Sequence, residues 1–169
     1  MNNNKIASSL LAELKEEAQA TRSILAVVPF DQLSYQPHPK SMTLQRLATH
    51  VAEINGWWKE CLVNDELDFA KSEFKPKVFE TNDDLLAFHD DLVHKAEQIL
   101  NNTSDEAFQK MWTMRNGDII YFSRPKYEVV RSWCMNHLFH HRAQLGVYLR
   151  MLDIPLPGVY GPTADSQDM

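Results

Sequence analysis

The chain has 169 residues, 44% of them hydrophobic, which is enough to bury one sizeable core and is close to the usual size of a single domain. Its formal net charge of -6 and its scattered Lys and Arg residues argue against a nucleic-acid-binding surface. No apolar run approaches the roughly 20 residues of a membrane span, and the amino terminus lacks a signal-peptide pattern. We therefore expect one cytoplasmic domain, 1–169, that binds neither nucleic acid nor membrane.

The first two helices are predicted from the periodicity of their apolar residues. These residues recur at helical spacing over 6–28, and Pro29 ends the pattern. A proline-containing connection follows over residues 31–40, where a helix is disfavoured. The second helix is expected over residues 44–63, because Thr43 is a good N-cap in front of an apolar stripe.

The second half of the chain predicts two more helices and an irregular tail. Residues 64–79 are charged and contain a proline, which predicts a surface crossover without an element of its own. A third helix is expected over residues 81–100, where early acidic residues suit the helix dipole. Residues 101–124 place an Asn-Gly turn signal between apolar runs, so a short hairpin or an extended lid is expected. The fourth helix should span 125–152, and prolines and glycines predict an irregular tail from about residue 153.

These elements together predict an all-α fold of the four-helix-bundle type. Good helix formers dominate the periodic stretches, and glycines and prolines cluster at the connections. Cys61 and Cys134 each lie in an apolar helical stretch, which is typical of buried small hydrophobic residues in a reducing compartment.

Three of the seven histidines are candidates for one metal site. His137 and His141 are four residues apart on the fourth helix, so their side chains lie one above the other. That face is otherwise apolar, so both imidazoles are expected to point into the bundle, where each ring needs a polar partner. His50 in the second helix is directed inward by apolar neighbours and is the third candidate. Three neutral imidazoles with an open position form a catalytic type of metal site.

The spacing of the histidines does not by itself exclude a bland alternative. A pair of histidines four residues apart is a weak signal, and the three rings could be core histidines that hydrogen-bond to the protein. The other four histidines are expected to be structural or solvated. His89 and His94 are five residues apart on one helix and should not converge, His38 lies between two prolines, and His140 is rotated by about 100° from its neighbour.

Three segments of the chain resemble the DinB family of bacterial proteins. His137–Leu145 resembles the family signature His-x-x-x-His-His-Arg-Gly-Gln in the last helix, and Ser41–His50 is similar to the capped second helix that ends in a ligand histidine. Pro155–Asp165 is similar to the ending that many members share. The three matches occur in the order of the family. Ala143 stands where the family usually has glycine, and a helix tolerates that change.

The resemblance implies an up-up-down-down four-helix bundle that is usually a homodimer. It also implies that nickel or zinc is held by three histidines, which map onto His50, His137 and His141. Members of the wider superfamily with an assigned activity resemble thiol transferases, which join a low-molecular-weight bacterial thiol, such as bacillithiol or mycothiol, to an electrophile. The expected function is therefore a metal-dependent thiol S-transferase that acts on a small molecule.

Other functions remain open at this point. A metal-dependent hydrolase is one, because an open metal position can also activate water. A non-catalytic metal-binding stress-response module and a purely structural bundle are others. No catalytic residue is assigned. Four residues are candidates for a supporting role around the metal: Arg142 could orient an anionic substrate or pair with a partner subunit, Gln144 could bond a ligand or water, and Tyr121 and Tyr160 could cap the cavity. Helix or core packing is the alternative for each of them.

Overall fold

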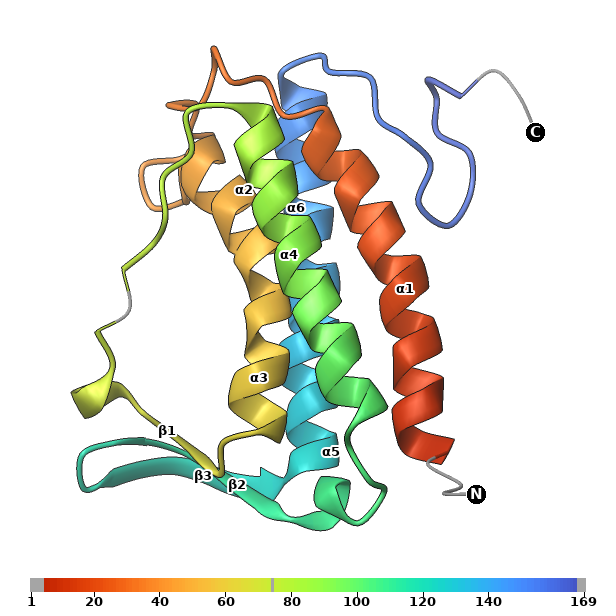
Figure 1. Cartoon of the computed structure of the whole chain (residues 1–169). Coiled ribbons are helices and arrows are strands. Elements are labelled where there is room, and N and C mark those ends of the chain that lie inside the picture. Colours follow the sequence, from red (N-terminus) through yellow and green to blue (C-terminus); the bar gives the residue numbers. More distant parts are fainter. Residues whose placement is uncertain (1–4, 74, 167–169) are drawn as a thin grey trace.

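The computed structural model describes residues 5–73 and 75–166 of the chain. Residues 1–4, 74 and 167–169, which belong to the predicted domain, crossover and tail, lie outside the described residues. Within the described part, four long helical segments run side by side, and a small sheet lies at one end (Figure 1).

Two of the four helical segments are regular, and two contain an irregular turn. In chain order the bounds are α1 (Lys5–Ala26), α2 (Leu44–Glu53), the 3-10 turn η1 (Ile54–Gly56), α3 (Trp57–Leu62), α4 (Asn82–Asn101), α5 (Lys126–Val129), the π-helical segment η4 (Val130–Asn136) and α6 (His137–Met151). The second segment is α2 to α3, and the fourth is α5 to α6. Each predicted helix is confirmed in its place, but the periodicity gave no sign of the irregular turns η1 and η4.

The expectation of a purely all-α chain is wrong, because three short strands form a sheet. Their bounds are β1 (Glu66–Asp68), β2 (Met111–Asn116) and β3 (Ile119–Pro125). The central β2 pairs in parallel with β1 and antiparallel with β3. The hairpin predicted between the third and fourth helices is confirmed as β2 and β3, with Gly117 at a φ of 59° in the turn. The strand β1 lies in the predicted crossover, and three residues are too few to give a periodic signal.

The helix directions also differ from the predicted up-up-down-down order. In Figure 1, α1 and α6 run upward, whereas α2, α3 and α4 run downward, so the order is up, down, down, up. The connections explain the difference. The chain between α1 and α2 turns round at one end of the molecule, so these helices are antiparallel. The segment between α3 and α4 returns along the length of the molecule, so these two helices are parallel.

Capping residues and two buried apolar clusters hold the helices in place. Thr43 and Thr81 accept hydrogen bonds from the backbone at the starts of α2 and α4, as their positions in the sequence predicted. One apolar cluster packs around the sheet end of the molecule, and the other packs α1, α2, α4 and α6 towards the opposite end. None of the helices in the described residues is long and apolar enough to cross a membrane.

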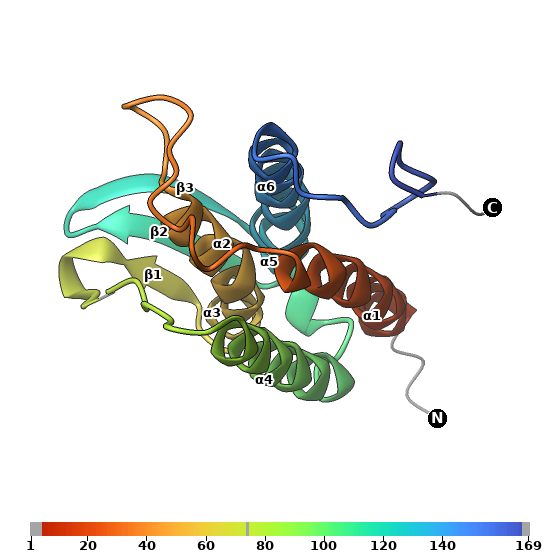
Figure 2. The same cartoon turned by 90° about the horizontal axis from the view of Figure 1, so that it is seen from above.

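The tail after α6 is irregular, as predicted, and it packs on the helices. It leaves α6 on the side of α1 (Figure 2). The hydroxyl of Tyr160 lies 2.9 Å from both carboxylate oxygens of Glu17 on α1. Within the tail, the hydroxyl of Thr163 donates to the carbonyl of Leu156. The tail is therefore attached to the opposite side of α6 from α2.

Candidate metal centre

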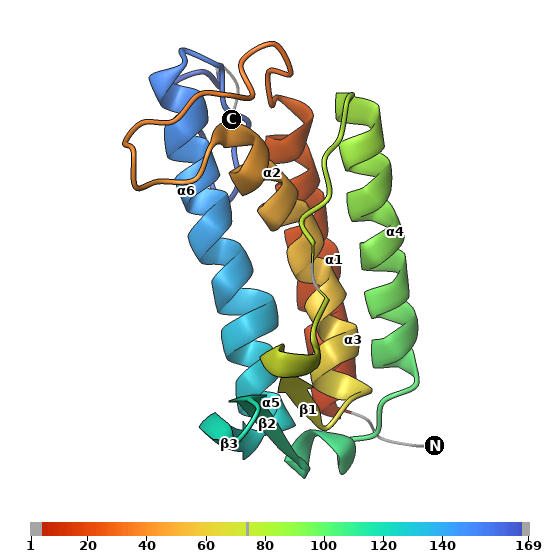
Figure 3. The same cartoon turned by 90° about the vertical axis from the view of Figure 1, so that its left-hand side faces the viewer.

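The three candidate histidines meet on the side of the molecule where α2 and α6 are neighbours (Figure 3). His50 lies on α2, and His137 and His141 lie on α6. One ring nitrogen from each of the three histidines lies within 4.8 Å of the other two. The Nε2 atoms of His50 and His137 are 3.1 Å apart. Two nitrogens bound to one zinc ion at about 2.05 Å in tetrahedral geometry would be about 3.3 Å apart. The trio therefore has dimensions compatible with a divalent metal ion.

The helix around His137 is not regular, and this affects where the histidines point. In η4 the backbone bonds reach one residue further than in an α-helix, so that the amide of His137 bonds to the carbonyl of Ser132. The core-facing residues of α6 are Leu138, Arg142, Leu145 and Leu149. His137 and His141 lie beside that face and are half-buried. The expectation that both rings point into the apolar core is therefore wrong, and the site is open to one side.

An acidic residue one helical turn after His50 orients its ring. Oε1 of Glu53 lies 2.8 Å from Nδ1 of His50 and accepts a bond of 2.7 Å from Nη2 of Arg46. Burial alone would raise the pKa of Glu53, but its bonds to His50 and Arg46 lower it below the usual value. An anionic carboxylate can only accept, so Nδ1 of His50 carries the proton and Nε2 presents a lone pair to the cluster.

The other two rings also have acceptors on their outer sides. Oε1 of Gln144 lies 2.8 Å from Nδ1 of His141, which assigns the proton of that ring to Nδ1. Nδ1 of His137 is buried, and no hydrogen bond of good geometry reaches it. The backbone carbonyl of Trp133 acts as a weak acceptor and raises the pKa of the ring. The rings of His50 and His141 therefore direct Nε2 lone pairs towards the cluster, whereas the proton of His137 is fixed by no side-chain partner. Lone pairs 3.1 Å apart repel each other unless a cation or a proton lies between them, so the donor set fits a metal ion.

Two of the three rings have pKa values below that of a free imidazole. Burial, and then the neighbouring rings of His50 and His141, lower the pKa of His137 to about 4. Burial also lowers the pKa of His141, although its bond to Gln144 opposes the shift. Both rings are therefore neutral at pH 7, which is the state that binds a metal ion.

Comparisons with known proteins place the chain in a family. The sequence model of the DinB family matches residues 1–168. The chain belongs to the DinB family. The protein YrdA of Bacillus subtilis (strain 168) is 26% identical to this DinB-family protein over 164 residues, which is 88% of this chain and 84% of YrdA.

Solved structures of DinB-like proteins share the fold of the chain. One from Bacillus subtilis has a TM-score of 0.70 at 16% identity, and covers 89% of this chain and 97% of its own. Another from Bacillus cereus ATCC 10987 has a TM-score of 0.67 at 21% identity, and covers 89% of this chain and 95% of its own. At these identities the likeness supports the DinB-like fold alone.

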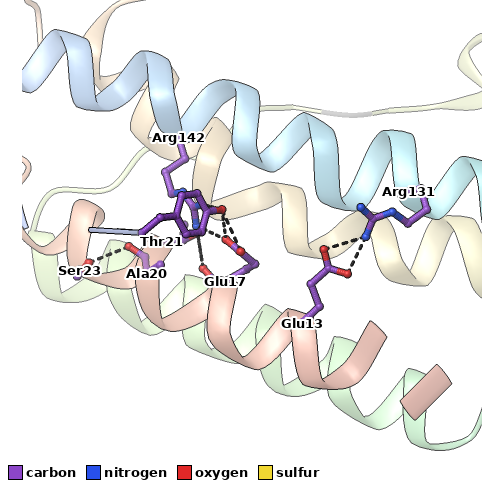
Figure 4. Close-up of polar contacts among 8 residues, drawn as sticks. Glu13, Glu17, Ala20, Thr21, Ser23, Arg131 and Arg142 are labelled. Carbon is purple, nitrogen blue, oxygen red and sulfur yellow. Dashed lines mark hydrogen bonds and ion pairs between the residues drawn. The ribbon is translucent and has the colours of Figure 1, made fainter. Parts of the chain in front are cut away.

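Arg142, a candidate for substrate binding, faces away from the histidines of the DinB-family signature. Its Nη1 forms a 2.7 Å ion pair with Glu17 and donates to the hydroxyl of Thr21 at 3.1 Å (Figure 4). Its Nη2 donates to the hydroxyl of Tyr160, which in turn donates to Glu17. Arg142 and Tyr160 therefore belong to a polar cluster between α1, α6 and the tail, in which Arg142 is buried and Tyr160 is 74% exposed.

The two remaining candidates have different positions. Gln144 touches the cluster through His141, so the expected supporting role is consistent with its place. Tyr121 lies on β3 at the sheet end, is 55% exposed, and packs edge-on against Phe69. It has no contact with the three histidines.

Sequence reasoning missed Glu53, Trp57 and Trp133 as neighbours of the site. Glu53 could have been found, because a carboxylate three residues after a helical ligand histidine can reach its outer nitrogen. The rings of Trp57 and Trp133 lie 6.3 and 5.6 Å from the ring of His137. Nothing in their spacing indicated that two distant tryptophans would meet there.

The other histidines do not join the cluster. His89 is buried and bonded to Asp90, and His94 is exposed and bonded to Gln98. Both line a surface groove of about 300 Å³ between α1 and α4. Within the described residues, only the trio brings three potential metal ligands close enough to share an ion.

Proposed function

We propose that this DinB-family protein binds one nickel or zinc ion through His50, His137 and His141 and acts as a metal-dependent thiol S-transferase. The observation that supports the proposal is the convergence of three imidazole rings, two of which, His50 and His141, are held from behind by Glu53 and Gln144. Three imidazoles suit either metal and leave positions open for a small ligand, in contrast to a closed structural site.

The residues around the cluster suit a reaction with a small molecule. When bound, the ion would supply Lewis acidity that lowers the pKa of a coordinated thiol. Glu53 and Gln144 hold two rings in the tautomer that presents Nε2, and the half-buried position leaves one side accessible. In the transfer, the thiol sulfur forms a bond to an electrophilic carbon, the bond from that carbon to its leaving group breaks, and the thiol proton passes to solvent.

The proposal is tested by assaying conjugation with defined reactants. Purified protein loaded with Ni²⁺ or Zn²⁺ would be incubated with a panel of bacterial thiols and 1-chloro-2,4-dinitrobenzene, and the thioether would be measured. We expect a rate that depends on both thiol and metal, is lost in His137→Ala, and is kept in His140→Ala, whose ring is exposed. No conjugation with any thiol would contradict the transferase. Hydrolysis of an ester without thiol would support the hydrolase instead, and metal binding with neither activity would support a non-catalytic module.

We also propose that the protein is a cytoplasmic homodimer. The dimer rests on membership of the DinB family, and light scattering after gel filtration tests it. The cytoplasmic placement rests on Cys61 and Cys134, which are buried thiols without a disulfide, as expected in a reducing compartment. Burial and the neighbouring Cys61 raise the pKa of Cys134 well above that of a free thiol, so it is unreactive.

A further inference from the structure

Two of the four tryptophans stay partly exposed beside the candidate metal centre. Trp58 and Trp112 are fully buried, whereas Trp57 and Trp133 are only half-buried. The rings of Trp57 and Trp133 are stacked, with centroids 5.3 Å apart and planes at 23°. The ring of Phe122 stacks on the far side of Trp133, at 6.2 Å and 21°. We call these three stacked rings, Trp57, Trp133 and Phe122, the aromatic row.

The aromatic row borders the histidine cluster at His137. The ring of His137 lies nearly perpendicular to Trp133, at 79°, and to Trp57, at 78°. Trp133 stacks with both Trp57 and Phe122, and the guanidinium of Arg124 lies over Phe122, 5.2 Å from its centroid. The row therefore presents a continuous aromatic surface next to the cluster.

The helix backbone is irregular at both tryptophans, and such irregular turns have less favourable hydrogen bonds than a regular α-helix. Trp57 directly follows the 3-10 turn η1, and Trp133 lies inside the π-helical segment η4. Regular α-helix has the better hydrogen-bond geometry, and single π-helical turns are rare and occur frequently at functional sites. The two irregular turns thus lie at the two places that set the tryptophans beside the cluster. Both tryptophans pack against the core cluster and still remain partly exposed there.

Half-exposed aromatic rings next to a polar centre are typical of a small-molecule site. Such sites combine apolar and aromatic walls with a few polar groups that fix the orientation of the ligand. The edge of an aromatic ring carries partial positive charge, so it attracts the electron-rich face of another ring. The imidazole of His137 already meets the row in this edge-to-face arrangement.

We propose that the aromatic row binds a planar aromatic group of the molecule that occupies the open metal position. This inference rests on the proposed metal site and names its substrate class. The ligand is a small molecule that combines a donor atom, such as a thiol sulfur, with a planar apolar group close to it. The row then selects aromatic over aliphatic ligands, while the three histidines bind the donor atom through the ion.

The affinity of model thiols for the Co²⁺-loaded protein tests this selection. Benzyl mercaptan, cyclohexylmethanethiol and 2-mercaptoethanol would be titrated, and binding would be followed by the charge-transfer absorption of the thiolate. We expect benzyl mercaptan to bind about tenfold more tightly than 2-mercaptoethanol, from ring contact and apolar burial together. Cyclohexylmethanethiol should bind several-fold more weakly than benzyl mercaptan, because it lacks a π face.

Variants assign the selection to the aromatic row. Trp57→Leu and Trp133→Leu should lose most of the preference for benzyl mercaptan and still bind one Co²⁺ per chain. Trp133→Phe should keep part of this preference. Tyr121→Leu should keep all of it, because Tyr121 is next to Phe122 on β3 but packs against Phe69. Equal affinities for the three thiols in the metal-loaded protein, or an unchanged preference in both Trp→Leu variants, would overturn the inference. A protein that takes up no metal would instead overturn the proposed function, and the inference with it.

Discussion

Two polar clusters lie on different sides of α6, and they differ in how completely their polar atoms are bonded. Arg142 faces α1, where Glu17 and Thr21 bind its guanidinium (Figure 4), and Tyr160 of the tail binds it as well. His141, the residue before it, faces α2, where the three imidazole rings converge and Nδ1 of His137 is buried without a hydrogen-bond partner. A buried polar group without a partner costs free energy, so the first cluster is complete as it stands, whereas the second has room for the stabilising effect of a shared cation.

The comparison separates structural from functional polar residues. Adjacent positions of one helix, within one sequence motif, take opposite roles because the helix turns about 100° between them. The bonded cluster joins α1, α6 and the tail, and its loss should affect stability. The open cluster joins only α2 and α6, and its loss should affect metal binding. Each prediction below tests one side of this division.

The largest expected effect is the loss of stability when Arg142 is replaced. In Arg142→Met the carboxylate of Glu17, which is only 9% exposed, would lose its cation. Breaking a buried ion pair on one side costs about 3 to 5 kcal/mol, which urea denaturation would measure. The matched control is Arg131→Met, whose 2.7 Å ion pair with Glu13 joins the same two segments but is about one-third exposed. That pair should contribute about 0 to 1 kcal/mol.

The metal content of the Arg142→Met variant tests whether the two polar clusters are independent. Arg142→Met should bind metal as the wild-type protein does, at temperatures where it is folded. Equal losses of stability in the two arginine variants would contradict the structural role of the Arg142 cluster. Loss of metal from folded Arg142→Met would show that the two clusters are coupled.

The next effect in size is a loss of metal affinity in Glu53→Gln. The neutral amide can still contact His50, but it no longer fixes the proton on Nδ1. Removing such a partner of a metal-binding histidine costs about 10 to 100-fold in affinity. Competition with a chelator measures the change. Gln144→Leu removes a neutral bond to His141 and should have a smaller effect, and an unchanged affinity in Glu53→Gln would rule out its orienting role.

The smallest expected effect is the pH dependence of stability in the metal-free protein. The pKa of His137 is about 4 in the folded chain, against about 6.5 in the unfolded chain. The unfolded state therefore binds more protons between these values, and stability falls as the pH falls from about 6.5 towards 4. Because the ring is only half-buried, we expect a loss of about 1 to 2 kcal/mol after allowing for solvent screening.

Replacement of the ring isolates this contribution from that of other groups. His137→Gln should show a smaller loss over the same pH range, whereas His140→Gln should stay close to the wild-type profile, because its exposed ring is the least of the causes that lower the pKa of His137. Urea denaturation at pH 7.5, 6, 5 and 4 in the presence of a chelator provides the comparison. Identical pH profiles for His137→Gln and the wild-type protein would contradict the assignment of the lowered pKa.

The helices could be predicted from the sequence, but the sheet and the helix directions could not. Apolar periodicity and the caps Thr43 and Thr81 define long helices locally. The strand β1 has only three residues and depends on a partner more than 40 residues away, so no local pattern reveals it. The helix directions depend on the path of the connections, and the π-helical segment η4 interrupts a sequence that is periodic enough for a regular helix.

The three histidines of the site could be predicted from the sequence. His137 and His141 share a helix face, and the apolar neighbours of His50, with the resemblance of Ser41–His50 to the second helix of the family, added the third residue. Arg142 and Tyr160 were candidates for the same site, but their place depends on Glu17, 125 residues before Arg142. A buried carboxylate on α1 directs both residues away from the histidines, and nothing in the signature itself indicates it.

The metal content of the protein tests the central claim most directly. Wild-type protein and the variants His50→Ala, His137→Ala, His141→Ala and His140→Ala would be loaded with Ni²⁺ or Zn²⁺, passed over a desalting column and assayed for metal and for folding. We predict about one ion per chain in the wild-type protein and in His140→Ala, and loss of most of the ion in each of the other three variants while they stay folded. Full occupancy in the other three variants, or none in the wild-type protein, would contradict the assignment of His50, His137 and His141 as a metal site.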